Sequence, residues 1–262
     1  MLTVSAVITA AGKNSRMRKD QENLNIPIQN KLTLPLKNGK YSSTIIETTI
    51  NNVLNTENID ECIVVLGHYC EEILPYINNI HDDRLKVIKN NPIDVGLSVS
   101  LLNGLQNINS DIALCVTGDQ PTVSTETFNN ILNTLFNSDN PRKTISILRR
   151  RKTGKLDTAE GLGMPFAADR MELIKYLHDK DDNLNPILRE IFADGEAQFK
   201  ALKSDAYEGI EVTYFSDRHT TGFDRLEAVL EKITNTSLSG SALMNVVGLI
   251  SNLEKKGICH MM

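Results

Sequence analysis

The sequence predicts an α/β fold, in which helices cover both faces of a mostly parallel sheet. Short apolar runs of strand length recur along the chain, and segments with helical spacing separate them. This alternation of strands and helices is typical of βαβ units. In such sheets ligands bind at the carboxyl ends of the strands, so motifs that directly follow a predicted strand are the candidates for function.

Five strands are expected in the first part of the chain. They are Val4–Ala10, Cys62–Leu66, Leu85–Ile88, Ile112–Val116 and Thr144–Leu148. Helices are expected between them at Ile45–Leu54, Glu71–Ile77, Ser98–Gln106 and Thr125–Phe136, the last with Ser124 positioned as its cap. Further along, helices are predicted at Met171–Leu177, Pro186–Phe192 and Arg225–Ile233, with a strand at Glu211–Phe215.

The composition shifts at Thr234, where Ser, Thr, Asn and Gly become frequent ahead of an apolar helical pattern at Leu243–Leu253. We therefore predict a main domain over residues 1–233 and a C-terminal helical extension over residues 234–262. The extension could dock a partner, form an oligomer contact or begin another module. The sequence contains no repeat that decides among these roles.

Composition limits the class of partner. The 262 residues are 40% hydrophobic and 23% charged, which suits a full core, and the formal net charge is −5. That charge gives no general attraction to nucleic acid or to an anionic membrane, so a phosphate ligand needs a local cluster of donors. We expect a small-molecule partner. The sequence also shows no signal-like or membrane-spanning run, which predicts a cytoplasmic protein with reduced cysteines.

The first predicted strand leads directly into the segment Ala10-Ala11-Gly12-Lys13-Asn14-Ser15-Arg16-Met17. Small residues let backbone amides approach a ligand closely, and amides in a glycine-containing turn can hold phosphate oxygens. We expect a phosphate loop lined by Ala10, Ala11, Gly12 and Ser15, with Arg16 as a charged fork for a polyphosphate. Taken alone, Ala-Ala-Gly is more typical of an ordinary strand-to-helix turn.

A second motif, Thr117-Gly118-Asp119-Gln120-Pro121, follows the predicted strand Ile112–Val116. Asp119 therefore lies at a strand end, where a carboxylate can hold Mg²⁺ together with substrate phosphates and water. Gly, Asp and Pro are also turn residues, and alone they would favour a turn. Combined with the first loop, they predict a site for a polyphosphate and its cation.

These motifs resemble a known family. The amino-terminal signature of nucleotidyltransferases with a Rossmann-like glycosyltransferase-A fold is similar to two segments here, Ala10–Met17 and Lys31-Leu32-Thr33-Leu34-Pro35-Leu36. Within that group, the segments most resemble the molybdenum cofactor cytidylyltransferases. The resemblance implies that Lys31 neutralises phosphate charge during transfer and that Asp119 binds the metal. An insertion at Arg18–Asn30 departs from the family pattern, so Lys19 is the alternative phosphate lysine.

Weaker likenesses extend the expected site. Asn91–Gly104 resembles the family's nucleotide-pocket segment, which implies contacts from Asn91, Gly96 and Ser98, although Ser98 could instead cap the next helix. Thr221–Glu227 resembles a late metal-binding segment, which makes Asp224 either a second metal ligand or a helix N-cap. On the acceptor side, Met164 stands where the family has histidine.

The expected function is that of a Mg²⁺-dependent enzyme. It would transfer a nucleotide from a nucleoside triphosphate, with CTP favoured, to a phosphate-bearing acceptor of molybdopterin type, releasing pyrophosphate. Arg16, Lys31 and Asp119 are the expected catalytic residues, and a molybdoenzyme partner is compatible with the resemblance. The alternatives are a sugar-phosphate or alcohol-phosphate nucleotidyltransferase and a non-catalytic nucleotide-binding scaffold. A dehydrogenase is disfavoured because the first loop lacks G-x-G-x-x-G.

Overall fold

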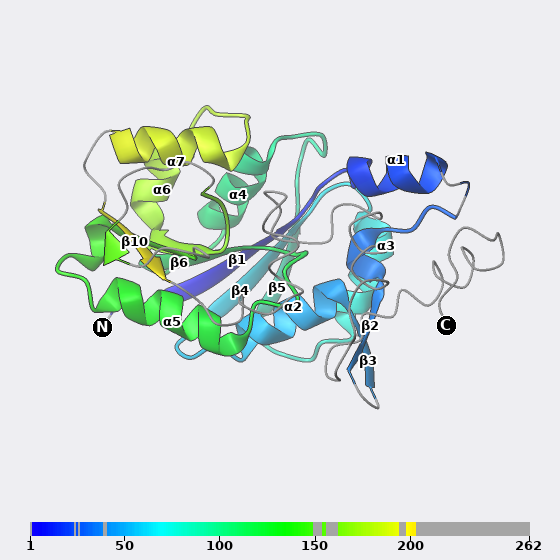
Figure 1. Cartoon of the computed structure of the whole chain (residues 1–262), viewed down its shortest axis with the longest axis horizontal. Coiled ribbons are helices and arrows are strands. Elements are labelled where there is room, and N and C mark those ends of the chain that lie inside the picture. The colour runs from blue at the N-terminus through cyan, green and yellow to red at the C-terminus, as the bar shows by residue number, and fades with distance from the viewer. Residues whose placement is uncertain are drawn as a thin grey trace.

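The computed structural model describes residues 2–23, 25, 27–38, 41–148, 154–155, 162–193 and 198–202. Its centre is an eight-stranded sheet with the order β5-β4-β1-β6-β9-β7-β10-β8. These strands are β1 (Val4–Ala10), β4 (Glu61–Leu66), β5 (Leu85–Lys89), β6 (Ile112–Thr117), β7 (Thr144–Leu148), β8 (Gly154–Lys155), β9 (Phe166–Asp169) and β10 (Gln198–Leu202). Six of them run in one direction, whereas β8 and β9 are antiparallel to their neighbours. Figure 1 shows the strands β4, β1 and β6 of this sheet between helices that lie above and below it.

The strands at the centre of the sheet end at the same edge. Ala10 of β1 lies opposite Leu66 of β4, and Thr9 lies opposite Thr117 of β6. The loops that follow these strands therefore emerge side by side. Two further strands, β2 (Pro35–Asn38) and β3 (Tyr41–Thr44), form a separate antiparallel hairpin.

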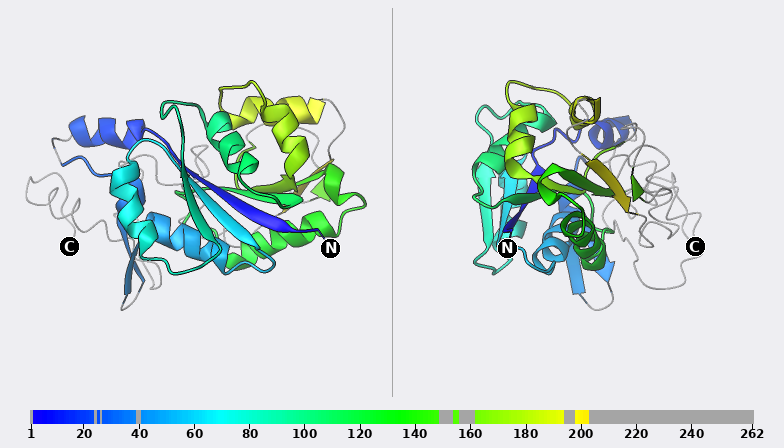
Figure 2. Two further views of the ribbon diagram at one scale, coloured as in Figure 1. Left: turned by 180° about the vertical axis from the view of Figure 1, so that it is seen from behind. Right: turned by 90° about the vertical axis from the view of Figure 1, so that its left-hand side faces the viewer.

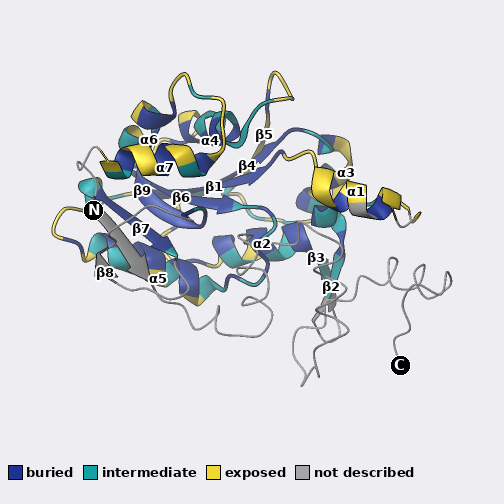
Figure 3. Cartoon of the chain, turned by 45° about the horizontal axis from the view of Figure 1, so that its top comes forward, coloured by how far each residue is buried: buried dark blue, intermediate teal, exposed yellow. Residues whose placement is uncertain are grey.

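Helices cover both faces of the sheet (Figure 2). One apolar cluster joins a sheet face to α2 (Ile45–Leu54), α3 (Cys70–Asn78) and α5 (Thr125–Phe136). The other joins the opposite face to α4 (Leu97–Gln106), α6 (Arg170–Leu177) and α7 (Leu184–Ala193). Because the central strands β4, β1 and β6 are buried on both faces (Figure 3), they are apolar at nearly every position, as predicted.

The predicted α/β fold is confirmed, and most predicted elements lie within two residues of the observed ones. The bounds of α2, α5 and β7 agree with the prediction, and Ser124 caps α5 by accepting a hydrogen bond from the Thr127 amide. Helix α1 (Ser15–Asn23) and the short strands β2, β3, β8, β9 and β10 were not predicted. The strand and helices predicted beyond residue 202, together with Asp224, lie outside the described residues.

The core cysteines are free thiols. Cys62 on β4 and Cys115 on β6 are fully buried, which confirms that both belong to the core. Burial raises the pKa of Cys62 to about 12, so its thiol stays protonated near neutral pH. Within the described part of the chain, no helix is both long and apolar enough to cross a lipid bilayer.

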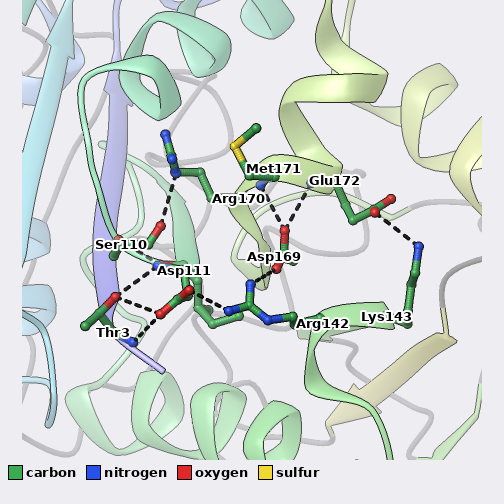
Figure 4. A network of polar contacts seen from close by, with 10 residues as sticks. Thr3, Ser110, Asp111, Arg142, Lys143, Asp169, Arg170, Met171 and Glu172 are labelled. Atoms are coloured by element: carbon green, nitrogen blue, oxygen red, sulfur yellow. Dashed lines mark hydrogen bonds and ion pairs between the residues drawn. The ribbon is translucent and has the colours of Figure 1, made fainter. Parts of the chain in front are cut away.

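A polar network joins β1, β6, β9 and the 3₁₀ turn η2 (Pro141–Lys143) at the edge opposite the strand ends described above (Figure 4). Arg142 donates to Asp111 Oδ1 at 2.6 Å and to Asp169 Oδ2 at 2.9 Å. The other oxygen of Asp169 caps α6 by accepting from the amides of Met171 and Glu172. Since only 5% of the Asp169 side chain is exposed, Arg142 is a substantial part of its charge compensation.

Replacing Arg142 with methionine is expected to lower the free energy of unfolding, because the nearly buried Asp169 carboxylate loses its charged partner. Urea unfolding at pH 7 measures this change. Lys143→Met is the matched control, because Lys143 pairs with the more exposed Glu172 and its loss should cost less. An Arg142→Met protein as stable as the wild type would contradict this role.

Asp111 should contribute to acid sensitivity. Hydrogen bonds from the Thr3 amide, Arg142 and the Thr3 hydroxyl lower the pKa of Asp111 to about 2. A carboxyl group whose folded pKa lies below its unfolded value of about 3.9 stabilises the fold above that value and loses this contribution as the pH falls toward 2. The stability difference between the wild type and Asp111→Asn should therefore shrink between about pH 4 and pH 2. A stability difference between the two proteins that stays constant from pH 4 to pH 2 would refute this role of Asp111.

Candidate functional site

Four adjacent strands deliver the loops of the candidate site. Strands β5, β4, β1 and β6 are neighbours in the sheet, and each is followed by a loop at the same edge. A cavity of about 190 Å³ lies there. Its lining consists of Thr9, Ala10, Ala11, Gly12, Asn14, Asn30, Lys31, Leu32, Val95, Leu97, Ser100, Thr117, Gly118 and Asp119. The phosphate loop and the carboxylate of Asp119 thus face one cavity, as the sequence predicts.

Lys31 and Asp119 meet on the cavity wall. The Lys31 Nζ atom donates to Asp119 Oδ2 at 2.6 Å, and the side chains are 19% and 17% exposed. Lys31 begins the 3₁₀ turn η1 (Lys31–Thr33), which Asn30 caps by accepting from the Leu32 amide. This cap holds the lysine against the loop that follows β6. Lys19 is exposed on α1 and does not line the cavity, so Lys31 is the one of the two lysines that faces it.

Asp119 is held as a carboxylate. Burial by itself would raise its pKa, but the charge and hydrogen bond of Lys31 outweigh burial and lower the pKa below its ordinary value. The Thr117 hydroxyl and the Asp119 amide act in the same direction. Thr117 lies near enough to favour the charged form without making a hydrogen bond of standard geometry. An ionised carboxylate is the form that binds a hard cation.

The turn after β1 is shaped by Asn14, which has the left-handed φ of 55°. Its Nδ2 atom donates to the Gln29 carbonyl at 3.2 Å, which ties the loop to the chain leading back to Lys31. Gly67 packs closely against this turn, because it has no side chain and a Cβ there would lie 2.8 Å from the Ala11 Cβ. A Cβ on Gly12 would meet nothing within 4 Å, so its surroundings are open.

Two polar atoms on residues lining the cavity have no hydrogen-bond partner within the described part of the structure. They are Asn14 Oδ1 and Thr117 Oγ1, both buried within the residues around them. Buried polar groups are normally paired, and unpaired ones need an explanation such as a ligand or water. Asn14 follows β1 and Thr117 ends the neighbouring strand β6, and both residues line the cavity, so a polar ligand there is one explanation for the two atoms.

The predicted residues divide into two groups. Ala10, Ala11, Gly12, Lys31 and Asp119 line the cavity. Ser15 and Arg16, exposed on α1, are not among the lining residues, and neither are Asn91, Gly96 and Ser98. Asp224 is outside the described residues.

The segment before α4 contributes different residues from those predicted. Ser98 is fully buried in the first turn of α4, where its hydroxyl donates to the Lys180 carbonyl and accepts from the Asp182 amide. Ser100 lines the cavity instead, and its hydroxyl accepts from Asn90 Nδ2 at 2.9 Å. The two serines are two positions apart on a helix and so point in different directions, which the motif alone does not resolve.

Other lining residues had no sequence signal of their own. Asn14 lies in the turn after β1, and Asn30 ends the insertion at Arg18–Asn30. Only the hydrogen bonds to Gln29 and Leu32 show their structural roles. Val95 and Leu97 are apolar and sit within a segment that already resembled a nucleotide pocket. Gln120 was quoted only as part of a motif, yet it is fully buried and donates to the Met164 carbonyl at 2.9 Å.

An ion pair joins two residues that are sequence neighbours of the cavity lining. Lys13 Nζ lies 2.6 Å from Asp94 Oδ1, which joins the phosphate loop to the loop before α4. The hydrogen bond and charge of Lys13 lower the pKa of Asp94, and both side chains are more than half exposed. An exposed pair of this kind contributes little to stability and can open when a ligand enters.

Comparisons with known proteins agree with this geometry. A family model described as the MobA-like NTP transferase domain matches residues 6–193. Another, described as C-terminal domain 6 of the ABC-three component systems, matches residues 172–262. Comparison with curated proteins gave no match.

Solved structures show the same fold. A nucleotidyl transferase from Methanothermobacter thermautotroptrophicus is 35% identical, with a TM-score of 0.74 over 87% of this chain and 95% of its own. The 4-diphosphocytidyl-2C-methyl-D-erythritol synthase of Anaerococcus prevotii is 17% identical, with a TM-score of 0.58 over 88% and 94% of the two chains. A Mycobacterium tuberculosis protein in complex with manganese is 17% identical, with a TM-score of 0.52 over 78% and 88%.

The family match covers most of the described chain, from β1 to the end of α7, and includes both Lys31 and Asp119. The Methanothermobacter nucleotidyl transferase matches this chain over 95% of its own length. This protein is therefore a nucleotidyltransferase that belongs to the family of MobA-like NTP transferase domains.

Proposed function

We propose that this nucleotidyltransferase uses Mg²⁺ and CTP to transfer a cytidylyl group to a phosphate-bearing acceptor, with release of pyrophosphate. The first acceptor to consider is of molybdopterin type. The observation that carries the proposal is the Lys31–Asp119 pair, which faces the phosphate loop across one cavity. A cation and an anion placed together on such a wall can exchange partners with a metal-bound polyphosphate.

The reaction forms one bond and breaks another. An acceptor phosphate oxygen attacks the α-phosphorus of CTP, a new P–O bond forms, and the bond between the α-phosphorus and the bridging oxygen breaks. The electron pair leaves with pyrophosphate. Because an acceptor phosphate is already ionised near neutral pH, no side chain has to remove a proton from it. The chain's task is to position the reactants and to stabilise negative charge.

The residues on the cavity wall suit that task. Lys31 would leave Asp119 and contact a phosphate oxygen, which places a positive charge where negative charge accumulates. Backbone groups of Ala11 and Gly12 would lie along the phosphates. Asn14 and Thr117 would offer their unpaired polar atoms to the ligand.

Asp119 fits the donor set for Mg²⁺. Among the described residues, no three His, Cys, Asp or Glu side chains gather into a potential metal site. Mg²⁺ is commonly held by one or two carboxylates and completes its octahedron with phosphate oxygens and water, so a single ionised Asp119 is compatible with it. When bound, the metal would neutralise phosphate charge. Asp224 is the proposed second carboxylate.

The nature of donor and acceptor rests on comparison and resemblance. The name of the Anaerococcus prevotii neighbour describes a cytidyl product, which supports CTP as the donor. The acceptor is proposed from the likeness of the phosphate loop and metal motif to molybdenum cofactor cytidylyltransferases. Sugar phosphates and alcohol phosphates are the alternative acceptors, because the same lysine and aspartate would serve all three classes.

Changing either member of the central pair should abolish most turnover. Lys31→Met and Asp119→Asn are each expected to lower the rate of Mg²⁺-dependent pyrophosphate release by roughly 10²–10³-fold, the usual effect of removing one group that stabilises transition-state charge. Lys19→Met is the matched control and should retain near wild-type activity. Wild-type rates in a folded Asp119→Asn protein would refute the role of Asp119. Loss of activity in Lys19→Met but not in Lys31→Met would assign the phosphate-binding role to Lys19 in place of Lys31.

A panel of triphosphates should reveal the donor. With Mg²⁺ present, CTP should raise the melting temperature more than ATP, GTP or UTP, because a ligand at 100 times its Kd adds about 2.7 kcal/mol of stability. Pyrophosphate release with molybdopterin-type, sugar-phosphate and alcohol-phosphate acceptors then identifies the acceptor. Equal shifts with all four triphosphates would contradict the CTP preference. Tight binding without turnover for any acceptor would favour the scaffold alternative.

A further inference from the structure

The amino end of α4 is capped by a distant segment. Gly96 is the N-cap residue and has no side chain to cap the helix. The Asp181 carboxylate accepts a hydrogen bond from the Gly96 amide, and the Asp182 carbonyl accepts one from the Ser98 amide at 3.1 Å. We call Lys180–Asp182 the capping turn. It lies between α6 and α7, more than eighty positions further along the chain.

The contact is close and has several components. The Ser98 hydroxyl donates to the Lys180 carbonyl at 2.9 Å and accepts from the Asp182 amide at 2.8 Å. A Cβ on Gly96 would overlap the Asp181 carboxylate and lie 3.1 Å from backbone atoms of Asp182. The φ of Gly96 is −69°, which suits most residues. Glycine is therefore required here by the capping turn and not by backbone conformation.

The capping turn matters for the cavity because it holds one of the cavity walls. Val95, Leu97 and Ser100, which line the cavity, lie just before or within the first turn of α4. The other half of α4 is fixed by Gly104, whose missing side chain lets the helix approach Val7 of β1 and Val65 of β4. Helix α4 is thus held at one end by the sheet and at the other by the capping turn.

We propose that the capping turn positions the nucleotide-facing wall of the cavity, and that Asp181 is its positioning residue. This inference rests on the proposed function, because it needs a nucleotide in the cavity. A carboxylate at a helix amino end satisfies an amide that would otherwise have no partner and interacts favourably with the helix dipole. Without Asp181, the first turn of α4 would fray, and the wall formed by Val95, Leu97 and Ser100 would lose its fixed place.

The role of Asp181 differs from that of Lys31 and Asp119. Asp181 does not line the cavity and is exposed, so it acts on a ligand only through the α4 amino end. Its carboxylate should matter as a hydrogen-bond acceptor more than as a charge. Asparagine keeps an acceptor oxygen at the same distance along the side chain, whereas alanine removes it.

The test compares nucleotide affinity with stability in the full-length protein. Isothermal titration with CTP and Mg²⁺, repeated with ATP, GTP and UTP, gives the Kd of the wild type and of Asp181→Ala, Asp181→Asn and Gly96→Ala. Thermal unfolding without ligand is measured for each variant. Asp139→Ala is the matched control, because Asp139 is an exposed carboxylate ahead of β7, at the opposite edge of the sheet.

Asp181→Ala is expected to raise the Kd of the bound triphosphate by roughly fivefold, the scale of losing one N-cap contact. Asp181→Asn should restore most of the affinity, Gly96→Ala should weaken it, and Asp139→Ala should leave it unchanged. Unchanged affinity in Asp181→Ala would overturn the inference, as would equal weakening in Asp181→Asn. If Asp181→Ala lowers the melting temperature without changing the Kd, Asp181 stabilises the fold but does not position the cavity wall. A wild-type protein that binds none of the four triphosphates would overturn the proposed function, and this inference with it.

Discussion

The ion pair between Lys31 and Asp119 is the contact on which the rest of the site depends. It joins residues 88 positions apart, one on a short 3₁₀ turn and the other after a central strand. Partly buried, the pair holds each charge in place without a ligand, and removal of either partner would leave a poorly solvated charge. The pair therefore holds both side chains on the cavity wall and keeps the pKa of Asp119 below its ordinary value, so that its carboxylate stays charged.

The fold supplies the geometry of that pair. Parallel strands β1 and β6 are adjacent, so the phosphate loop and the Asp119 loop emerge beside each other. Lys31 reaches the same place by a longer route through α1, whose Met17 and Gln21 are buried one turn apart. Gln21 pairs with the backbone of Gln29 and so helps to return the chain. The insertion after Met17 is thus compatible with a correctly placed lysine.

Sequence patterns predicted the features that depend on neighbouring residues in the chain, and they missed those that depend on tertiary contacts. The bounds of α2 and α5 could be read from apolar spacing and capping residues, and Asp119 from its place after an apolar strand. Helix α1 is mostly polar, so it lacked the apolar stripe that reveals a helix, and β9 has only four residues held by pairing with β6 and β7. Ser98 was predicted to contact the nucleotide, but its hydrogen bonds to Lys180 and Asp182 depend on tertiary contacts that no local pattern carries. The domain boundary at residue 233 stays a prediction.

The most direct measurement is a crystal structure of the protein with Mg²⁺ and a non-hydrolysable CTP analogue. We predict that the triphosphate lies along the loop of Ala11 and Gly12, with the Lys31 ammonium moved from Asp119 to a phosphate oxygen and the Asp119 carboxylate on the metal. A triphosphate bound away from this loop, with the Lys31–Asp119 contact still at its ligand-free distance of 2.6 Å, would contradict it.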